Sequence, residues 1–337
     1  MKFYSIVQQP IKIYGLAVAD GEQKRFWRLS EEIIKAMPQY ERLGRRCAGG
    51  RVRFCTDSSR LAIKMTLANV TPDICIPLSG ASGADVYLGK GKDARFIGYV
   101  SPLLYSEQEF TVEKTFCKGT KMELVTINLP RNDHLLGLEI GIEENAQIKE
   151  APEYTIDKPI VFYGSSITEG GCALRVGNAY TSLVSRWLDA DYFNFGFSGS
   201  ARGEETFANY IANMGEISAF VYDYDHNAPT PEHLAKTHES FFKIIRKAYP
   251  NVPILFMTKP DVDWYPEDAK ARKEIIYRTY LNAKAAGDEK VWFLDGGTFF
   301  GEEGRSECTV DGTHPTDLGF TKMAQSVYPV LKEMLKL

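Results

Sequence analysis

From about residue 151 onward, short apolar runs alternate with segments of helical period, and this alternation narrows the possible folds more than any other feature of the chain. The predicted strands are 160–163, 192–195, 219–223, 253–257 and 291–294, and the helices that follow them are 178–188, 204–214, 231–248, 266–286 and 316–335. Five strand–helix units predict a parallel sheet with helices on both faces, which is the flavodoxin-like α/β class. Ligands of such sheets bind beyond the carboxyl ends of the strands.

Residues from about 50 to 148 follow a different pattern. Short β-prone runs, separated by Gly, Pro, Asn and Asp, recur at 51–55, 62–67, 84–88, 96–100, 110–116, 122–129 and 135–142. Many short strands at this spacing predict an all-β sandwich or jelly roll. Residues 1–49 contain one short helical segment at 31–37, and we assign them to this β region. Pro152 and Pro159 bracket a linker, so we expect two domains, 1–150 and 151–337.

Composition excludes several classes of partner. The chain is 44% hydrophobic and 25% charged, with a formal net charge of −4, which gives no electrostatic reason to expect nucleic acid or an anionic membrane. No apolar run of about 18 residues predicts a transmembrane helix. The first ten residues lack the apolar core of a signal peptide, which predicts a cytoplasmic protein, or an exported one if a signal was removed. The six cysteines have no metal-binding spacing and are expected to be free thiols, or one or two disulfides in an exported protein.

A serine pair follows the first strand of the α/β region. The run 160–163 leads directly into Gly164, Ser165 and Ser166, and a bend follows at Gly170 and Gly171. A hydroxyl at the end of a buried strand and at the start of a helix has the position of an activated nucleophile. Ser166 is the candidate and Ser165 is its rival, and both could instead serve as turn or N-cap residues.

Three further polar clusters follow later strands. The segment 194–199 offers Gly199, whose N–H could bind an oxyanion. In the segment 223–229, Asn227 could donate a side-chain N–H to the same oxyanion, and His226 could act as a base. Near the C-terminus, Asp311 and His314 stand three residues apart, a spacing that lets the carboxylate orient the imidazole. Each cluster is also compatible with an ordinary turn, but all of them follow strands of one predicted sheet.

The order and content of these clusters resemble the SGNH, or GDSL-type, hydrolase family. In this resemblance Ser166 matches the nucleophile, Gly199 and Asn227 match the oxyanion residues, and Asp311 and His314 match the last block. The resemblance covers residues 158–337. It implies an SGNH fold and ester hydrolysis through an acyl-enzyme, with Ser166, Gly199 and Asn227 forming the oxyanion hole and with no metal or organic cofactor.

Two departures and one further motif accompany this resemblance. Ser165 stands where the family usually has Asp, and Asp225 stands where the third block usually has Gly. The segment 80–87, Gly-Ala-Ser-Gly-Ala-Asp-Val-Tyr, looks like the Gly-x-Asp-Leu-Tyr motif of a β domain that precedes some bacterial SGNH hydrolases. That match, with Val86 in place of Leu, agrees with the β pattern of the N-terminal region.

The expected substrate is a short-chain ester, most simply an acetyl group on a sugar or oligosaccharide. The β domain beside the catalytic sheet resembles the arrangement in carbohydrate esterases, and no long apolar lid segment is present. Residues expected to form polar walls of the pocket are Tyr224, Asp225, Arg175 and Arg202. Three alternatives stay open: a lipase or thioesterase of the same family, a non-enzymatic sugar-binding protein with a vestigial triad, and a metal site built from Asp225, Asp311 and His314.

Overall fold

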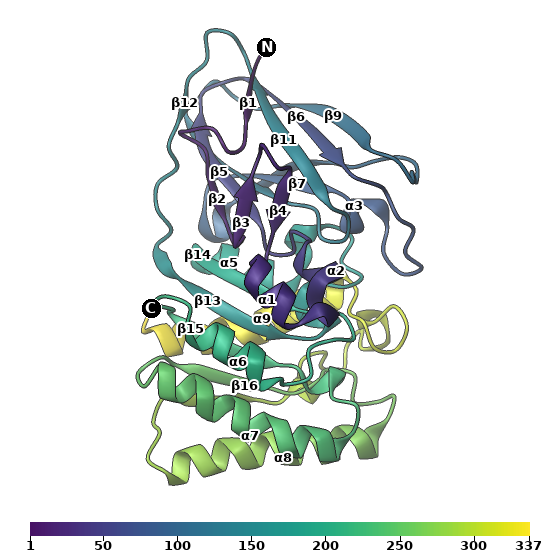
Figure 1. The fold of residues 1–337 in the computed structure, drawn as a ribbon, viewed down its shortest axis with the longest axis vertical. Helices are drawn as coiled ribbons and strands as arrows, with labels where there is room; N and C mark the ends of the chain where they lie inside the picture. The colour runs from purple at the N-terminus through teal and green to yellow at the C-terminus, as the bar shows by residue number, and fades with distance from the viewer.

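The computed structural model describes residues 1–337 and contains two layered regions (Figure 1). We call them the N-terminal β region, residues 1–150, and the α/β region, residues 151–337. Figure 1 shows the strands of the first stacked above the sheet and helices of the second. None of the helices combines the length and the apolar character needed to cross a membrane.

A five-stranded parallel sheet forms the centre of the α/β region, with the strand order β14-β13-β15-β16-β17. Its strands are β13 (Ile156–Gly164), β14 (Ala190–Gly196), β15 (Ala219–Asp223), β16 (Ile254–Met257) and β17 (Val291–Leu294). Its helices are α4 (Ser166–Glu169), α5 (Tyr180–Leu188), α6 (Glu205–Ala212), α7 (Pro231–Ala248), α8 (Pro266–Ala285) and α9 (Asp317–Leu335). The predicted flavodoxin-like sheet is confirmed; the long helices end within two residues of the expected positions, whereas β13 begins four residues earlier.

Successive side chains of the buried strands point to opposite faces of this sheet, and helices cover both faces. Ile160 and Phe162 of β13 belong to an apolar core shared with α5 and α9, whereas Val161 and Tyr163 belong to the core on the opposite face, shared with α6 and α7. All four side chains are fully buried. A strand covered on both faces must be apolar at every position, which explains the continuous run at 160–163.

The N-terminal β region is a sandwich of two antiparallel sheets, as predicted. One sheet has the order β1 (Lys2–Ser5), β11 (Leu135–Ile142), β6 (Arg60–Leu67) and β9 (Phe110–Cys117). The other has the order β12 (Ile148–Lys149), β5 (Arg51–Thr56), β10 (Glu123–Asn128), β7 (Ala84–Leu88) and β8 (Arg95–Val100), and β2 (Lys12–Tyr14) also pairs with β5. A hairpin of β3 (Val18–Asp20) and β4 (Arg25–Trp27) and the short helix α3 (Leu78–Ala81) complete it.

The first 49 residues do not belong to the sandwich alone, in contrast to the sequence-based assignment. β1 and β2 pair with sandwich strands, but the helices α1 (Glu31–Ala36) and α2 (Glu41–Gly44) pack against the α/β core. Ile33, Tyr40 and Leu43 share one buried cluster with residues of β13, β14 and α6. In Figure 1 both helices lie between the sandwich and α6. This segment therefore ties the two regions together, and we call the buried surface between them the seam.

Candidate active site

Ser166, His314, Asp311, Gly199 and Asn227 meet at the carboxyl edge of the parallel sheet, in a cleft of about 440 Å³ that we call the Ser166 cleft. Loops after β13, β14 and β15 and the loop before α9 line it, together with a loop of the N-terminal β region. The lining residues are Asp73, Cys75, Ile76, Ser166, Gly171, Cys172, Ser198, Gly199, His226, Asn227, Asp311, Thr313 and His314. Both lining cysteines are free thiols.

The two adjacent serines have different surroundings. Ser166 is the first residue of α4 and lines the cleft, whereas Ser165 is the N-cap residue, with its Oγ accepting a hydrogen bond from the Ile167 N–H at 3.1 Å. Ser165 is 1% exposed and cannot reach a ligand. Asp and Ser are both good N-cap residues, so Ser165 can fill the capping role of the aspartate that the family usually has here.

Gly164 is required by the close approach of three segments at this turn. A Cβ at this position would lie 2.0 Å from Thr168 Oγ1 and 2.3 Å from the Asp223 carbonyl oxygen, closer than any real side chain comes. A larger residue would push α4 away from the sheet edge and displace Ser166. The Gly before the serine pair is therefore explained by packing, independently of any chemistry.

Ser166, His314 and Asp311 form a continuous hydrogen-bonded chain. Ser166 Oγ lies 2.9 Å from His314 Nε2, and His314 Nδ1 lies 2.8 Å from Asp311 Oδ2. The other oxygen of Asp311 accepts the backbone N–H groups of Thr313 and His314 at 3.0 and 2.8 Å. Burial alone would raise the pKa of Asp311, but these hydrogen bonds lower it below its ordinary value. An ionised Asp311 fixes the tautomer of His314 and leaves Nε2 facing the serine.

His226, the rival base, also lines the cleft but faces a different partner. Its Nε2 lies 3.1 Å from Asp261 Oδ2, and it makes no hydrogen bond with Ser166. Burial alone would lower the pKa of His226, but the hydrogen bond to Asp261 and its charge raise that pKa. Asp261 also accepts a hydrogen bond from Thr313 Oγ1 at 3.2 Å. The His226–Asp261 pair therefore supports the loop that carries His314.

Two hydrogen-bond donors from other loops line the cleft together with Ser166. Gly199 has a left-handed backbone with φ of 64°, nothing lies within 4 Å of the position of a Cβ, and its N–H donates to no protein acceptor. Asn227 Nδ2 donates one hydrogen to the Phe197 carbonyl at 2.7 Å, which fixes the amide and leaves its second hydrogen free. Both residues line the cleft, so an oxyanion could be bound between them.

A buried ion pair that the sequence did not suggest supports this arrangement. Arg28 donates to Glu169 Oε1 at 2.7 Å and to the Gly196 carbonyl at 2.7 Å, and the side chains of Arg28 and Glu169 are 0% and 3% exposed. The second oxygen of Glu169 accepts the backbone N–H and the hydroxyl of Ser198. Burial alone would raise the pKa of Glu169, but the charge of Arg28 and the Ser198 hydrogen bonds lower it. Helix α4, which carries Ser166, and the Gly199 loop are thus held together by Arg28 of the N-terminal β region.

None of the four predicted wall residues lines the Ser166 cleft. Tyr224 is 1% exposed, and its hydroxyl is bonded to Thr237; Asp225 is fully buried and accepts the Lys259 N–H at 3.0 Å. Arg175 lies against the Phe96 ring at 3.6 Å, on the side facing the β region. Arg202 is exposed and lies 3.5 Å from the Gly199 carbonyl, although it does not line the cleft. Strand-end position alone did not distinguish side chains that point into the cleft from those that point into the core.

The N-terminal β region supplies part of the cleft wall, through Asp73, Cys75 and Ile76. These residues lie before α3 in a loop that has no motif, so the sequence offered no signal for their role. The alternative metal site is not assembled, because Asp225 is buried away from Asp311 and His314. No group of three or more His, Cys, Asp or Glu side chains in the chain is arranged to hold a metal ion.

Residues 157–332 match the GDSL-like lipase/acylhydrolase family, which is just over half of the chain. The protein belongs to the GDSL-like lipase/acylhydrolase family. Residues 1–148 match the GxDLY family, the N-terminus of SGNH-hydrolase-type esterases. No curated protein sequence matches this GDSL-like chain.

Solved structures resemble this GDSL-like protein over its full length. A protein described as a GDSL-like lipase from Bacteroides ovatus is 26% identical with a TM-score of 0.86, over 99% of this chain and 98% of that one. A salicylyl-acyltransferase from a tetracycline biosynthetic pathway is 20% identical with a TM-score of 0.79, over 99% and 97%. An acetyl xylan esterase from the rumen bacterium Butyrivibrio proteoclasticus is 15% identical with a TM-score of 0.61, over 99% and 98%. The last two likenesses establish the shared fold alone.

Proposed function

We propose that this GDSL-like protein is a serine esterase that removes short acyl groups, acetyl above all, from carbohydrates through an acyl-enzyme on Ser166. The observation that carries the proposal is the hydrogen-bonded chain from Ser166 Oγ through His314 to Asp311, with lengths of 2.9 and 2.8 Å. Nucleophile, base and orienting carboxylate in this geometry are the parts that acyl transfer requires. Family membership supports the reaction class independently.

The proposed reaction has two stages, acylation of Ser166 and hydrolysis of the acyl-enzyme, and His314 transfers the proton in each. His314 Nε2 takes the Ser166 proton as Oγ attacks the ester carbonyl carbon, and Asp311 stabilises the resulting imidazolium. The tetrahedral oxyanion accepts hydrogen bonds from the N–H groups of Ser166 and Gly199 and from the free amide hydrogen of Asn227. Collapse expels the sugar alcohol with the proton from His314. Water, deprotonated by His314, then attacks the acyl-enzyme and releases the acid.

The character of the cleft supports a small acyl group on a polar alcohol. Its few apolar residues are Cys75, Ile76 and Cys172, which form no channel for a long chain. Its polar walls include Asp73 and His226, which suit the hydroxyl groups of a sugar. One protein of similar structure is an acetyl xylan esterase, which agrees with this substrate class. We further propose that residues 1–150 and 151–337 act as two domains that share the substrate cleft.

An exposed aromatic ring beside the cleft favours a carbohydrate over a simple ester. Trp264 is 58% exposed, and its ring packs directly against Gly312, in the loop that carries Asp311 and His314. The outer face of an indole is a suitable surface for the C–H groups of a pyranose. Gly312 has φ of 85°, and a Cβ there would lie 2.6 Å from the ring, so Gly is needed for this packing.

The nucleophile is tested by paired serine variants on p-nitrophenyl acetate. Ser166→Ala should lower kcat at least about 10³-fold, whereas Ser165→Ala, which removes only a cap, should keep most of the activity. A serine-directed phosphonate should label the peptide that contains Ser166, at Ser166 itself. Labelling of Ser165, or full activity of Ser166→Ala, would refute the proposed mechanism.

The substrate class is tested by acyl length and by Trp264. Rates on p-nitrophenyl esters should fall steeply beyond about four carbons, since each misfitting methylene costs about 1–3 kcal/mol. Trp264→Ala should raise KM for acetylated oligosaccharides several-fold and leave p-nitrophenyl acetate hydrolysis unchanged. An optimum at eight carbons or more, or no release of acetate from any acetylated glycan, would favour a lipase or thioesterase and leave the serine mechanism untouched.

A further inference from the structure

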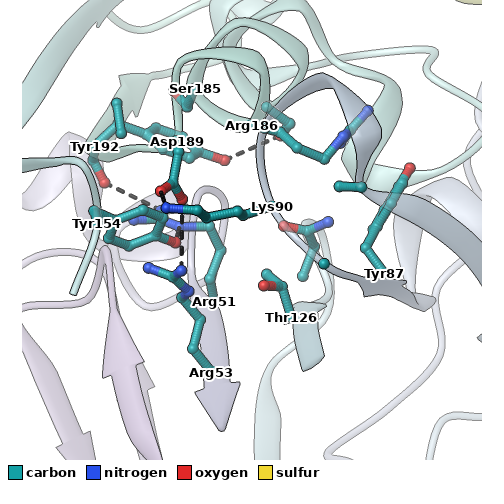
Figure 2. Close-up of a pocket in the computed structure, with 16 residues that line it drawn as sticks. Arg51, Arg53, Tyr87, Lys90, Thr126, Tyr154, Ser185, Arg186, Asp189 and Tyr192 are labelled. Carbon is teal, nitrogen blue, oxygen red and sulfur yellow. Dashed lines mark hydrogen bonds and ion pairs between the residues drawn. The ribbon is translucent and has the colours of Figure 1, made fainter. Parts of the chain in front are cut away.

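Two cavities outside the Ser166 cleft differ in size and in how their charges are matched. The cavity inside the seam measures about 30 Å³ (Figure 2). Figure 2 shows Arg53 beside Asp189, and Arg51 is likewise paired with Asp191, so these buried arginines have carboxylate partners within the protein. The other cavity measures about 660 Å³ and is lined mainly by partly or fully exposed residues of the α/β region. The larger cavity is therefore the better candidate for a ligand.

This larger cavity lies between the loop that follows β16 and the segment between β17 and α9, and we call it the Trp264 groove. Its volume is within the range of about 300–1,000 Å³ that is typical of small-molecule sites. It shares no lining residue with the Ser166 cleft. None of its lining residues takes part in the proposed ester hydrolysis itself.

A single loop separates the groove from the cleft. Asp311 and His314 line the cleft, whereas Gly312, which stands between them in the sequence, lines the groove. Asp261 of the groove accepts a hydrogen bond at 3.2 Å from Oγ1 of Thr313, which lines the cleft. The two sites are thus one layer of residues apart, and one extended ligand can reach both.

The groove presents a flat aromatic ring on a fixed support. Trp264 lines the groove, is 58% exposed and rests against Gly312. Its neighbour Asp263 accepts a hydrogen bond from Arg305 Nε at 2.6 Å, which ties the loop after β16 to the segment before α9. Arg305 also donates to the Gly301 carbonyl at 3.3 Å. A ring held in this way can bind the C–H face of a pyranose at little cost in conformational entropy.

The polar groups of the groove determine which sugars fit. Asp263 is neutralised by Arg305, whereas Glu302 and Glu307 are exposed and form no ion pair. Their carboxylates, together with the hydroxyl of Ser306, can hydrogen-bond to sugar hydroxyl groups. The two unpaired negative charges repel a ligand that has carboxylates of its own. The groove therefore suits neutral sugar residues and disfavours uronates.

We propose that the Trp264 groove is a second glycan-binding site, which holds neutral, unacylated sugar residues of the chain whose acylated sugar occupies the Ser166 cleft. Since this site presupposes the proposed esterase function, it adds to that function a preference for oligosaccharides over monosaccharides. Stacking on Trp264 supplies the affinity, and Glu302 and Glu307 discriminate against uronates.

The dependence of acetyl release on chain length tests the groove. The substrates are acetylated mono- and tetrasaccharides of xylose and of glucose at equal ester concentration. In at least one of these two neutral series, kcat/KM of the wild-type protein should be about tenfold higher for the tetrasaccharide. Ser306→Trp, which fills the groove, should bring this ratio close to one. Ser240→Trp, at an exposed position on α7, should keep the wild-type ratio.

A charged series tests the discrimination against uronates. Acetylated galacturonic acid and its acetylated tetramer should differ little in kcat/KM, because the groove repels the additional uronate residues. The double variant Glu302→Gln/Glu307→Gln should raise the ratio of tetramer to monomer several-fold in this series. Glu274→Gln, at an exposed position on α8, should leave it unchanged. A full gain from chain length in the galacturonate series of the wild type would contradict the assigned selectivity.

Isothermal titration with unacylated xylotetraose and cellotetraose measures binding without catalysis. Saturable binding that Ser306→Trp removes is the expected result. Equal kcat/KM for mono- and tetrasaccharides in both neutral series, without saturable binding, would overturn the second site and leave the esterase function intact. A chain-length preference that persists in Ser306→Trp would also overturn it. If no acetylated sugar is hydrolysed, the proposed function fails, and the titration alone then decides whether the groove binds glycans.

Discussion

The Ser166 cleft and the seam both concentrate polar side chains, but they bury them to different degrees. In the cleft, His314 and Asp311 are 30% and 37% exposed and each makes directed hydrogen bonds. In the seam, Arg28, Arg51 and Arg53 are at most 4% exposed. A half-exposed imidazole can exchange a proton with a substrate, whereas a buried guanidinium cannot change its charge and can only hold its neighbours in place.

This difference in burial indicates that the Ser166 cleft and the seam have separate tasks. The cleft places reactive groups on short loops at the edge of a rigid sheet. The seam fixes how those loops sit, because Glu169 of α4 contacts Arg28 directly and Ser198 of the Gly199 loop is bound to Glu169. Changes in the cleft should therefore affect the reaction with the fold intact, and changes in the seam should affect the fold first.

The largest effect on activity is expected from His314, the proposed base. His314→Gln should lower kcat at least about 10³-fold, because Ser166 loses its proton acceptor, while the free energy of unfolding changes little. His226→Gln, its matched control in the same cleft, should lower kcat by less than about tenfold, since His226 faces Asp261. Steady-state kinetics on p-nitrophenyl acetate measures kcat for both variants. A larger loss of kcat in His226→Gln than in His314→Gln would assign the role of base to His226.

In the seam, Arg28→Met should act mainly on stability. It leaves Glu169 buried without its partner, which typically costs about 3–5 kcal/mol in the free energy of unfolding. Urea unfolding followed by the fluorescence of the four tryptophans measures this loss. The double variant Arg28→Met/Glu169→Gln should recover part of it, because the uncompensated charge is gone.

A surface ion pair provides the comparison for this measurement. Lys158 and Glu216 lie 2.9 Å apart with half or more of each side chain exposed, so Lys158→Met should cost less than about 1 kcal/mol. Equal losses for Lys158→Met and Arg28→Met would contradict the claim that burial makes the seam pair important.

The sequence predicted the cleft better than the seam for a physical reason. Asp311 and His314 are three residues apart, and the strand ends that carry Ser166, Gly199 and Asn227 meet in any sheet of this topology, so local motifs were sufficient. Arg28 and Glu169 are 141 residues apart and belong to different regions. No local pattern marks such a pair, and a buried arginine looks like a surface residue in the sequence.

The errors within the α/β region have a related cause. Tyr224 and Asp225 follow β15 even more closely than Asn227 does, but only His226 and Asn227 of the short 3₁₀ turn 225–227 line the cleft. The direction of a side chain in a turn depends on backbone angles that the sequence did not reveal. The packing of α1 and α2 on the α/β core was missed because their amphipathic pattern does not identify the surface they cover.

A smaller loss of activity is expected from Asn227, the proposed oxyanion donor. Asn227→Ala should lower kcat about 10²–10³-fold with little change in KM, because its free hydrogen acts on charge that develops only in the transition state. Asn209→Ala, at an exposed position on α6, should leave both constants unchanged. An effect confined to KM would instead make Asn227 a ground-state binding residue, and the cleft would then rely on backbone N–H groups alone.

The last expected effect is a pH dependence of stability from Asp223, which is buried like the seam residues but lies beside the cleft. It lies at the end of β15 beneath the cleft, is 4% exposed, and accepts hydrogen bonds from Thr168 and Tyr180, both at 2.9 Å, with no cationic partner. Burial, together with the charge of Asp225, raises the pKa of Asp223 to about 7. The seam carboxylate Glu169 stays ionised beside Arg28, whereas Asp223 keeps its proton at acidic pH.

The sign of the resulting pH dependence follows from proton binding. Between about pH 4, where the unfolded carboxyl ionises, and about pH 7, the folded state holds a proton that the unfolded state has lost. Rising pH therefore destabilises the protein through Asp223 by at most about 1.4 kcal/mol per pH unit, and the loss levels off above about pH 7. Urea unfolding at pH 4.5 to 8 should show a flatter profile for Asp223→Asn, whereas Asp157→Asn, at an exposed position on β13, should keep the wild-type slope. Equal slopes for the wild type and Asp223→Asn would mean that Asp223 is ionised despite its burial, and that hydroxyl donors alone can replace the arginines of the seam.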